Sequence, residues 1–177
     1  MQPQAKRLYL LRIVKIMTLI IVFTSFFVLF SNFFRSQEVR QTFAIPIEEV
    51  KAALQVSTTW GQQPILVVWR SPLSLSKLTD GTGLRDPLSE QAQQPEFARN
   101  PWRSRRPEVF VLVPLGTAIG CPIEPMFQAG DLLGFRDRCR GWRYDAAGRV
   151  LENQEALRNL RVPDYVIVDG QLRFGDE

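Results

Sequence analysis

Two cysteines, Cys121 and Cys139, are the residues of this 177-residue chain best suited to soft-metal or redox chemistry, and the sequence contains no histidine. A structural zinc site takes four Cys or His ligands, and a catalytic zinc site takes three with a water. An iron–sulfur cluster takes four Cys, or two Cys with two His. The chain cannot supply either set, and without His it also lacks the usual base for serine or cysteine nucleophiles.

Thiol–disulfide exchange is the one reaction that this cysteine pair leaves open. Such exchange requires an exposed thiolate of low pKa, and the two cysteines often form a Cys-x-x-Cys motif. Cys121 and Cys139 are 139 − 121 = 18 positions apart, which is unlike that motif. A redox pair therefore stays as an alternative, and the main expectation is that the chain is not an enzyme.

The charge distribution separates the start of the chain from the rest. The first 36 residues contain five basic residues and no acid, namely Lys6, Arg7, Arg12, Lys15 and Arg35. The remaining 17 of the 22 Lys and Arg residues stand against all 18 Asp and Glu residues. This later part is nearly neutral, so its charge gives no reason to expect nucleic acid as a partner.

The segment from Ile16 to Phe34 is an uncharged and mostly apolar run. As a helix with a rise of ~1.5 Å per residue, it is about 28 Å long, close to the hydrocarbon thickness of a bilayer. A cleaved signal peptide has a shorter apolar core and ends in small residues, whereas this run ends in Phe33, Phe34 and Arg35. We therefore expect a retained anchor in the lipid bilayer. The positive charge before it predicts a cytoplasmic N-terminus.

Small and polar residues interrupt this apolar run, namely Thr18, Thr24, Ser25, Ser31 and Asn32. Inside a membrane, such side chains can pack against neighbouring helices. Their hydroxyl groups can equally bond to the backbone of their own helix. Both interpretations stay open from the sequence.

The segment after the anchor combines a linker with the first signs of folded structure. Residues 36–55 are placed in a linker, although Ile47 to Val56 shows a brief helical pattern. The apolar run from Ile65 to Trp69 is rich in β-branched residues and predicts a buried strand. Ser71-Pro72 then suits the start of a short helix, because proline is favoured at the first helical position.

A long polar segment from Thr79 to Ser104 predicts a loop. Four arginines gather at its end beside Trp102, namely Arg99, Arg103, Arg105 and Arg106. They could contact lipid phosphates or an acidic partner. They could also belong to a loop that simply faces solvent.

Two further patterns complete the expectation of a small, mainly β domain. Val109 to Val113 predicts a second strand. Asp169-Gly170 lies between the strand-like runs Val166–Val168 and Gln171–Phe174. This dipeptide predicts a two-residue hairpin turn, because both central positions of such a turn need positive φ.

Two segments resemble the cluster-binding loops of Rieske iron–sulfur proteins from the cytochrome bc complex family. The family's first loop reads Cys-Thr-His-Leu-Gly-Cys, and its second reads Cys-Pro-Cys-His-Gly-Ser-x-Tyr-Asp-x-x-Gly-Arg. The corresponding residues here are Gly116-Thr117-Ala118-Ile119-Gly120-Cys121 and Asp137-Arg138-Cys139-Arg140-Gly141-Trp142-Arg143-Tyr144-Asp145-Ala146-Ala147-Gly148-Arg149. The resemblance runs in order from about Val56 to Phe174. It implies a mainly β, Rieske-like antiparallel domain over residues 56–177, behind one transmembrane helix in residues 1–35.

The resemblance also implies that the cluster ligands are lost. In the family, the first Cys and the His of each loop bind the two irons, and these positions correspond to Gly116, Ala118, Asp137 and Arg140 here. Glycine and alanine offer no donor atom, and aspartate offers a hard oxygen. Arginine stays cationic and has no free lone pair for a metal. No metal and no cofactor are therefore expected.

Other positions of the family's cluster site are partly kept. The second Cys of each family loop forms a disulfide between the loops, which the resemblance assigns to Cys121 and Cys139. Tyr144 matches a tyrosine that bonds a ligand sulfur in the family, whereas Trp142 replaces a serine. The family's Gly-Pro-Ala-Pro loop is replaced around residues 153–157, where we expect a capped helical turn. Asp137 and Arg140 either pair inside the vacated site or both point into solvent.

The resemblance and the missing ligands imply a non-catalytic accessory subunit of a respiratory membrane complex, a cytochrome bc complex or its supercomplex with an oxidase. The expected partners are cytochrome b, cytochrome c1 or oxidase subunits. The expected location is the cytoplasmic (inner) membrane with the domain in the periplasm, or the mitochondrial inner membrane with the domain in the intermembrane space. The alternative is a regulatory or assembly factor that mimics the Rieske head at its docking site.

Overall fold

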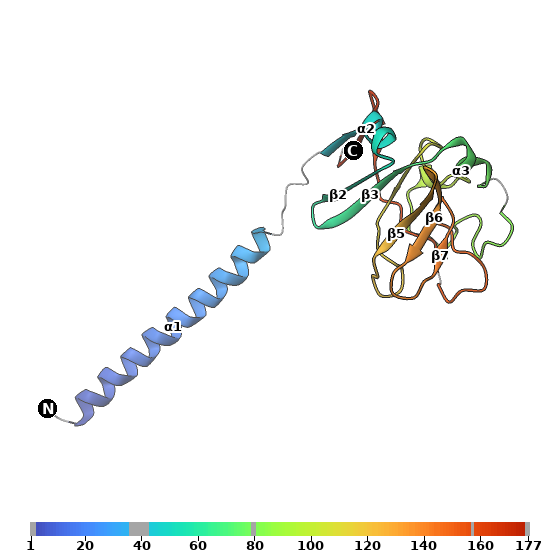
Figure 1. Ribbon diagram of the computed structural model, residues 1–177. Coiled ribbons are helices and arrows are strands. Elements are labelled where there is room, and N and C mark those ends of the chain that lie inside the picture. Colours follow the sequence, from blue (N-terminus) through green and yellow to red (C-terminus); the bar gives the residue numbers. More distant parts are fainter. Residues whose placement is uncertain (1–2, 36–42, 79–80, 157, 176–177) are drawn as a thin grey trace. The chain divides into compact units, whose positions relative to one another are not determined.

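The computed structural model describes residues 3–35, 43–78, 81–156 and 158–175, and it divides into two units, Met1–Val39 and Arg40–Glu177. The first unit is the helix α1, Pro3–Arg35 (Figure 1). Within it, Tyr9–Ser31 is long and apolar enough to cross a membrane. Length and composition thus agree with the single anchor predicted from the sequence.

The polar side chains of α1 that the structure describes include two threonines bonded to their own helix. The Thr18 hydroxyl donates to the carbonyl oxygen of Val14 at 2.8 Å, and the Thr24 hydroxyl donates to that of Ile20 at 2.9 Å. Such bonds satisfy a hydroxyl group without a neighbouring helix. These two residues therefore need no partner in the membrane for their hydrogen bonds.

The second unit contains three antiparallel sheets of three strands each. The first sheet joins β1, Phe43–Pro46, to β9, Gln171–Phe174, and β9 to β8, Val166–Val168. Asp169 and Gly170 have φ of 49° and 74°, as the predicted hairpin turn requires. Because β1 pairs with β9, residues that the sequence placed in a linker are part of this unit.

The second sheet contains the two strands that the apolar runs predicted. It has the order β2, Gln55–Trp60, then β3, Gln63–Trp69, then β4, Val109–Leu112. The helix α2, Ile47–Ala53, precedes this sheet and buries Ile47 and Val50. The folded unit therefore starts before residue 56, the boundary that the resemblance gave.

A short helix follows β3 as the sequence predicted. This helix is α3, Pro72–Ser76, with proline in its first turn. The Ser71 hydroxyl oxygen accepts a hydrogen bond from the Ser74 backbone N–H at 3.1 Å. Ser71 is therefore the N-cap of α3, and its hydroxyl oxygen satisfies a backbone N–H that has no partner within the helix.

The third sheet positions the two loops that resemble cluster-binding loops. Its order is β5, Ile123–Gln128, then β6, Asp131–Asp137, then β7, Arg143–Tyr144 (Figure 1). The first loop ends directly before β5, and the second loop connects β6 to β7. Ile123 lies opposite Asp137 in the register of β5 and β6, so the sheet holds the two loops side by side.

The core of this unit lies between the sheets and also contains arginines. The Phe110 and Phe135 rings, from the second and third sheets, lie 5.8 Å apart. Arg103 is only 1% exposed, so both interpretations of the arginine cluster are wrong for this residue. Arg99 follows the 3-10 turn Glu96–Ala98 and pairs with Glu96 at the surface, as in a solvated loop.

Candidate functional site: two disulfide-linked loops

The two loops are closed by short backbone hydrogen bonds. In the first loop, the Gly116 N–H donates to the carbonyl oxygen of Cys121 at 2.7 Å. In the second loop, the Asp137 N–H donates to the carbonyl oxygen of Trp142 at 2.8 Å. In each loop, the first and last residues are therefore held together by a backbone hydrogen bond, which restricts the conformation of the residues between them.

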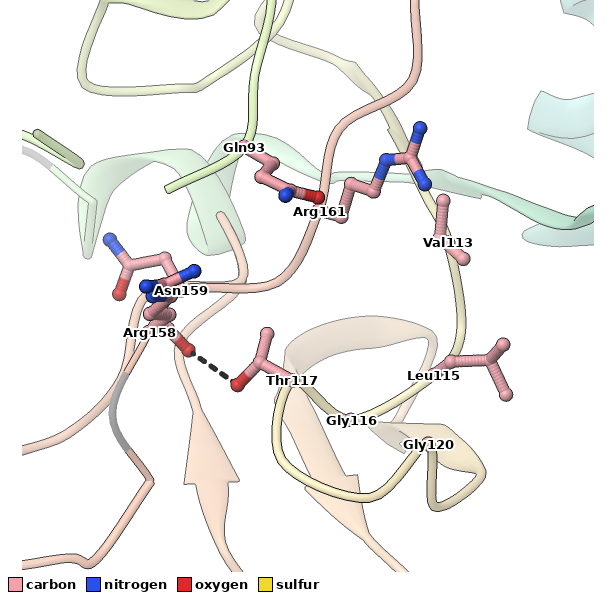
Figure 2. A pocket seen from close by; sticks show the side chains of 9 residues that line it. All are labelled: Gln93, Val113, Leu115, Gly116, Thr117, Gly120, Arg158, Asn159 and Arg161. Atoms are coloured by element: carbon pink, nitrogen blue, oxygen red, sulfur yellow. Dashed lines mark hydrogen bonds between the residues drawn. The ribbon is translucent and has the colours of Figure 1, made fainter. Parts of the chain in front are cut away.

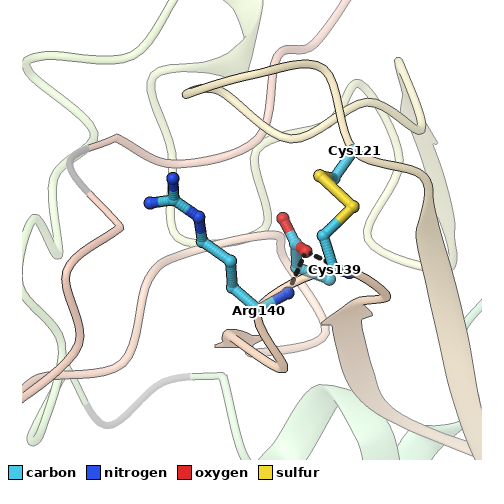
Figure 3. Close-up of a disulfide and its surroundings, with 4 residues drawn as sticks. Cys121, Cys139 and Arg140 are labelled. Carbon is cyan, nitrogen blue, oxygen red and sulfur yellow. Dashed lines mark hydrogen bonds between the residues drawn. A yellow bond between two sulfur atoms is a disulfide. The ribbon is translucent and has the colours of Figure 1, made fainter.

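Cys121 and Cys139 form a disulfide between the two loops, with a Cα–Cα distance of 6.0 Å (Figure 3). The resemblance predicted this bridge, and the structure confirms it. Cys121 is buried at 5% exposure, whereas Cys139 lies at the surface. The bridge joins residues 18 positions apart and is the one covalent link between the loops in the part of the chain that the structure describes.

Asp137 turns into the protein and not toward solvent. Its side chain is buried at 2% exposure. One carboxylate oxygen, Oδ1, accepts hydrogen bonds from the backbone N–H groups of Cys139 at 2.8 Å and Arg140 at 2.9 Å (Figure 3). Hydrogen bonds to a charged acceptor are stronger than neutral ones. Asp137 therefore holds the second loop from inside, at a position that corresponds to a cluster ligand.

The other carboxylate oxygen of Asp137 occupies space beside Gly116. A Cβ atom built on Gly116 would lie 2.8 Å from Asp137 Oδ2, closer than real Cβ atoms come to other heavy atoms. Gly116 and Asp137 correspond to the first Cys of each family loop. The carboxylate thus fills the room that a side chain at residue 116 would need, and the two replacements are sterically coupled.

The Arg140 side chain lies at the surface of the second loop, and its guanidinium group does not pair with the Asp137 carboxylate. Its guanidinium carbon is 4.8 Å from the centre of the Trp142 ring, which is buried at 8% exposure. No ion pair joins Asp137 and Arg140, both of which belong to the described part of the chain. Neither interpretation from the sequence is correct, because one side chain is buried and the other covers an aromatic ring.

Tyr144 keeps its family position, but its hydroxyl group lacks a hydrogen bond of ordinary geometry. The residue is 1% exposed, and the Thr117 side chain lies close to it. Burial raises the pKa of Tyr144 to about 12, and the nearby negative charge of Asp137 adds to this rise. An unpaired buried hydroxyl is unfavourable, so this group does not stabilise the loops through a hydrogen bond.

The segment that replaces the family's proline-rich loop forms turns. Asn153 has a φ of 62°, and residues 153–156 contain no helix, so the predicted helical turn is wrong over these residues. Leu157 lies outside the described residues. The Gln154 side chain bonds both the N–H and the carbonyl oxygen of Arg143, at 2.6 and 2.8 Å. It thereby ties this segment to β7.

The donor atoms around these loops do not fit a Rieske cluster. Donor atoms of Cys121, Asp137 and Cys139 lie within 4.8 Å of one another. The two sulfurs are joined in the disulfide, so neither is a thiolate, which is the form that binds metals. Two thiolates and two imidazoles are required for such a cluster, and the chain has no histidine to complete the set.

Sequence reasoning missed a pocket beside the first loop (Figure 2). It has a volume of about 290 Å³ and is lined by Gln93, Val113, Leu115, Gly116, Thr117, Gly120, Arg158, Asn159 and Arg161. The Thr117 hydroxyl donates across it to the carbonyl oxygen of Arg158 at 3.3 Å. The lining residues come from segments far apart in sequence, so no local pattern could have revealed the pocket.

Sheet-borne loops linked by a disulfide define a Rieske-type head, here in a chain with one candidate membrane helix. The chain belongs to the family of Rieske iron–sulfur subunits of ubiquinol–cytochrome c reductase. It is 36% identical over 140 residues to the iron–sulfur subunit of this reductase from Allochromatium vinosum, covering 74% of this chain and 68% of that protein. It is 29% identical to the Rieske subunit of the mitochondrial cytochrome b-c1 complex of Gallus gallus and spans 43% of that protein.

Other comparisons add the following. No family model matches the chain. Among solved structures, the plasma membrane Rieske protein of Synechocystis PCC 6803 gives a TM-score of 0.45 at 16% identity, covering 72% of this chain and 91% of that one. A hyperthermophilic respiratory complex III gives a TM-score of 0.46 at 16% identity, covering 76% and 74%. The family assignment rests on the sequence identity.

Proposed function

We propose that this chain is a non-catalytic accessory subunit of a respiratory membrane complex, with a Rieske-type head that stabilises assembly without a cluster. The carrying observation is the position of Asp137. Its carboxylate is buried, caps the second loop and excludes a side chain at Gly116. Two ligand positions have thus become parts of a packed structure, as expected of a head kept for its shape.

The relatives supply the class of complex for this proposal. They are named as subunits of ubiquinol–cytochrome c reductase and of the cytochrome b-c1 complex. We therefore propose cytochrome b, cytochrome c1 or oxidase subunits as partners. The basic residues before the anchor support a cytoplasmic N-terminus and a head in the periplasm, or in the intermembrane space of a mitochondrion.

Two other functions are less well supported. A redox role for the cysteines would need an exposed and reactive thiolate, whereas Cys121 is buried in a bridge between two loops. A mimic of the Rieske head would need a similar contact surface. Exposed Arg138 and Arg140 place positive charge on the second loop instead.

Affinity purification of the tagged full chain in mild detergent tests the proposal. We expect an assembled complex with full turnover to co-purify. Recovery with assembly intermediates alone would favour the regulatory function. The same chain, expressed without its partners, should be colourless and free of iron. Near-stoichiometric iron with a Rieske-type electron paramagnetic resonance signal would overturn the proposal. A reduction potential of the bridge well above about −300 mV would revive the redox role.

A further inference from the structure

The pocket beside the first loop is unusual in its charge. Arg158 and Arg161 line it, and no acidic residue does. Within the described residues, the ion pairs join other groups, and neither of these two guanidinium groups takes part in one. Glu155 stands three positions before Arg158, a spacing that brings side chains together on a helix, but residues 153–156 are not helical and no ion pair joins these two described residues. Among the described residues, two positive charges thus line this pocket without a counter-charge.

The other polar side chains of the lining include Thr117 and Asn159, which already form hydrogen bonds within the protein. The Thr117 hydroxyl gives its proton to the carbonyl oxygen of Arg158. The Asn159 side-chain amide donates to Asp86 and Ser89, and its oxygen accepts from the Val150 N–H. The two guanidinium groups are therefore the cationic donors of the lining, and they lie on different sides of the pocket, Arg158 beside Asn159 and Arg161 beside Val113 (Figure 2). Guanidinium groups bind carboxylates through paired hydrogen bonds, so the pocket favours an anion with that geometry.

The edge of the pocket is apolar and open to solvent. Leu115 lines the pocket and is 38% exposed, and Ile119 on the same loop is 66% exposed. Interfaces between proteins combine buried apolar contacts with arginine anchors in this way. A volume of about 290 Å³ is at the lower limit of small-molecule sites, and it suits the insertion of a side chain.

We infer that this pocket receives an acidic side chain from a partner subunit of the complex, and that Leu115 and Ile119 pack against the same partner. The inference rests on the proposed function, since it requires a partner complex. It adds the chemistry of the contact, an acidic side chain attracted by the positive charges of Arg158 and Arg161, and the face of the head that makes it.

Charge reversal in the full-length chain tests the contact. The double variant R158E/R161E should reduce recovery of the complex by at least about tenfold, because it replaces an attraction to the partner's carboxylate by a repulsion between like charges. The milder R158Q/R161Q keeps polar side chains, although shorter ones, removes the positive charges without reversing them, and should also lose complex. K51E/K77E is the matched control, since Lys51 and Lys77 are exposed on other elements and the change in net charge is the same. This control should retain the complex.

The outcomes separate the two proposals. If wild type recovers the complex and R158E/R161E recovers it equally, the pocket inference fails and the proposed function stands. If wild type recovers no complex, the proposed function fails. A photo-crosslinking amino acid at Leu115 then decides the pocket in intact membranes. An adduct with an acidic segment of another protein supports the inference, whereas adducts with phospholipid alone, or no adduct, overturn it.

Discussion

The buried arginine Arg103 and the loop aspartate Asp137 show two ways of placing a charge inside this unit. Arg103 donates to the Gln94 side chain and to three backbone carbonyl oxygens, those of Ala147, Gly148 and Leu160, at 2.6–3.1 Å. Asp137 accepts two backbone N–H groups, both from its own loop. The arginine therefore connects distant segments, whereas the aspartate organises one turn.

This difference predicts in which of the two regions the loss of one side chain costs the unit more stability. Around Arg103, several segments share one guanidinium group, so the loss of that group affects all of them. At the two loops, the disulfide and the Asp137 carboxylate act separately, and the Tyr144 hydroxyl has no proper partner. We therefore expect larger energetic effects from the arginine than from any single group of the loops.

The largest expected effect comes from Arg103→Met, which replaces the guanidinium group by an unbranched apolar side chain. It removes the guanidinium donor from the carbonyl oxygens of Ala147, Gly148 and Leu160, and it should lower the free energy of unfolding by about 4 kcal/mol. Burial lowers the pKa of Arg103 to about 10, which is still far above neutral pH, so the native group is charged. Urea unfolding of the full chain in detergent measures the effect.

Arg99→Met is the matched control for this prediction. Arg99 pairs with Glu96 at the surface, and such pairs contribute only about 0–1 kcal/mol. Its variant should unfold at nearly the same urea concentration as wild type. An equal loss of stability in both variants would show that the buried hydrogen bonds of Arg103 contribute no more than a surface ion pair, and the expected difference between Arg103 and the loops would be wrong.

The second prediction concerns the bridge between the loops. Cys139→Ser opens a loop of 18 positions and should cost about 3 kcal/mol in the chain-entropy model. The reason is that the unfolded chain gains freedom, and in this head the bridge is the remaining link where the family also has a cluster. Thermal unfolding with and without reductant measures it.

Reductant should destabilise wild type as much as the substitution does, and it should leave the stability of Cys139→Ser unchanged. A different response to reductant would contradict the prediction, and so would two further observations. Free thiols at both positions in protein prepared without reductant would remove its basis. Loss of turnover from a complex that stays assembled in the variant would favour the redox pair instead.

The parts of the fold that were predictable are those with local signals. The turn at Asp169-Gly170 follows from residues that tolerate positive φ, and the buried strand from Ile65 to Trp69 follows from its apolar run. In both cases, neighbours in sequence decide the structure, so the local sequence carries enough information. The disulfide was implied instead by the resemblance of two segments to the loops of a known family.

The parts that were not predictable depend on contacts between distant residues. Phe43–Pro46 has no strong strand pattern and becomes a strand because it pairs with β9. The burial of Arg103 depends on carbonyl oxygens from residues 147, 148 and 160. Asp137 turns inward because the closed loop presents two N–H groups to it, which is a property of the folded turn and not of the residue type.

The third prediction tests whether Gly116 and Asp137 depend on each other. Gly116→Ala places a Cβ against Asp137 Oδ2 and should destabilise by about 1–3 kcal/mol, as overpacking does. Gly81→Ala is the control, because its nearest contact, with Pro87, is an ordinary 3.4 Å. A double-mutant cycle of unfolding free energies with Asp137→Ala measures the coupling.

The cycle has a clear expected sign. Asp137→Ala removes the carboxylate that the new methyl group meets, so Gly116→Ala should cost less in that background than in wild type. Strict additivity of the two losses would mean that the methyl group and the carboxylate do not compete for the same space. The steric coupling of the two loops would then be wrong, and the loops would be linked by the bridge alone.

The smallest expected effect concerns the Tyr144 hydroxyl and tests whether this group stabilises the fold. At neutral pH, Tyr144→Phe should leave stability unchanged or raise it by up to about 1 kcal/mol, because it removes a buried group without a proper hydrogen bond. The folded state holds the pKa of Tyr144 at about 12, against 10.0 when unfolded, so the stability that depends on the phenol staying neutral is fully present below pH 10. That contribution is lost as the pH rises through 12. The buried arginines titrate equally in both proteins, so the difference between wild type and Tyr144→Phe isolates the tyrosine.

We expect the stability of wild type to fall more steeply than that of the variant between pH 10 and 12, in unfolding measured at several pH values. A clear loss of stability in Tyr144→Phe at neutral pH would show instead that the hydroxyl forms a useful bond, for example with Thr117, and that the loops are better satisfied than their hydrogen bonds indicate.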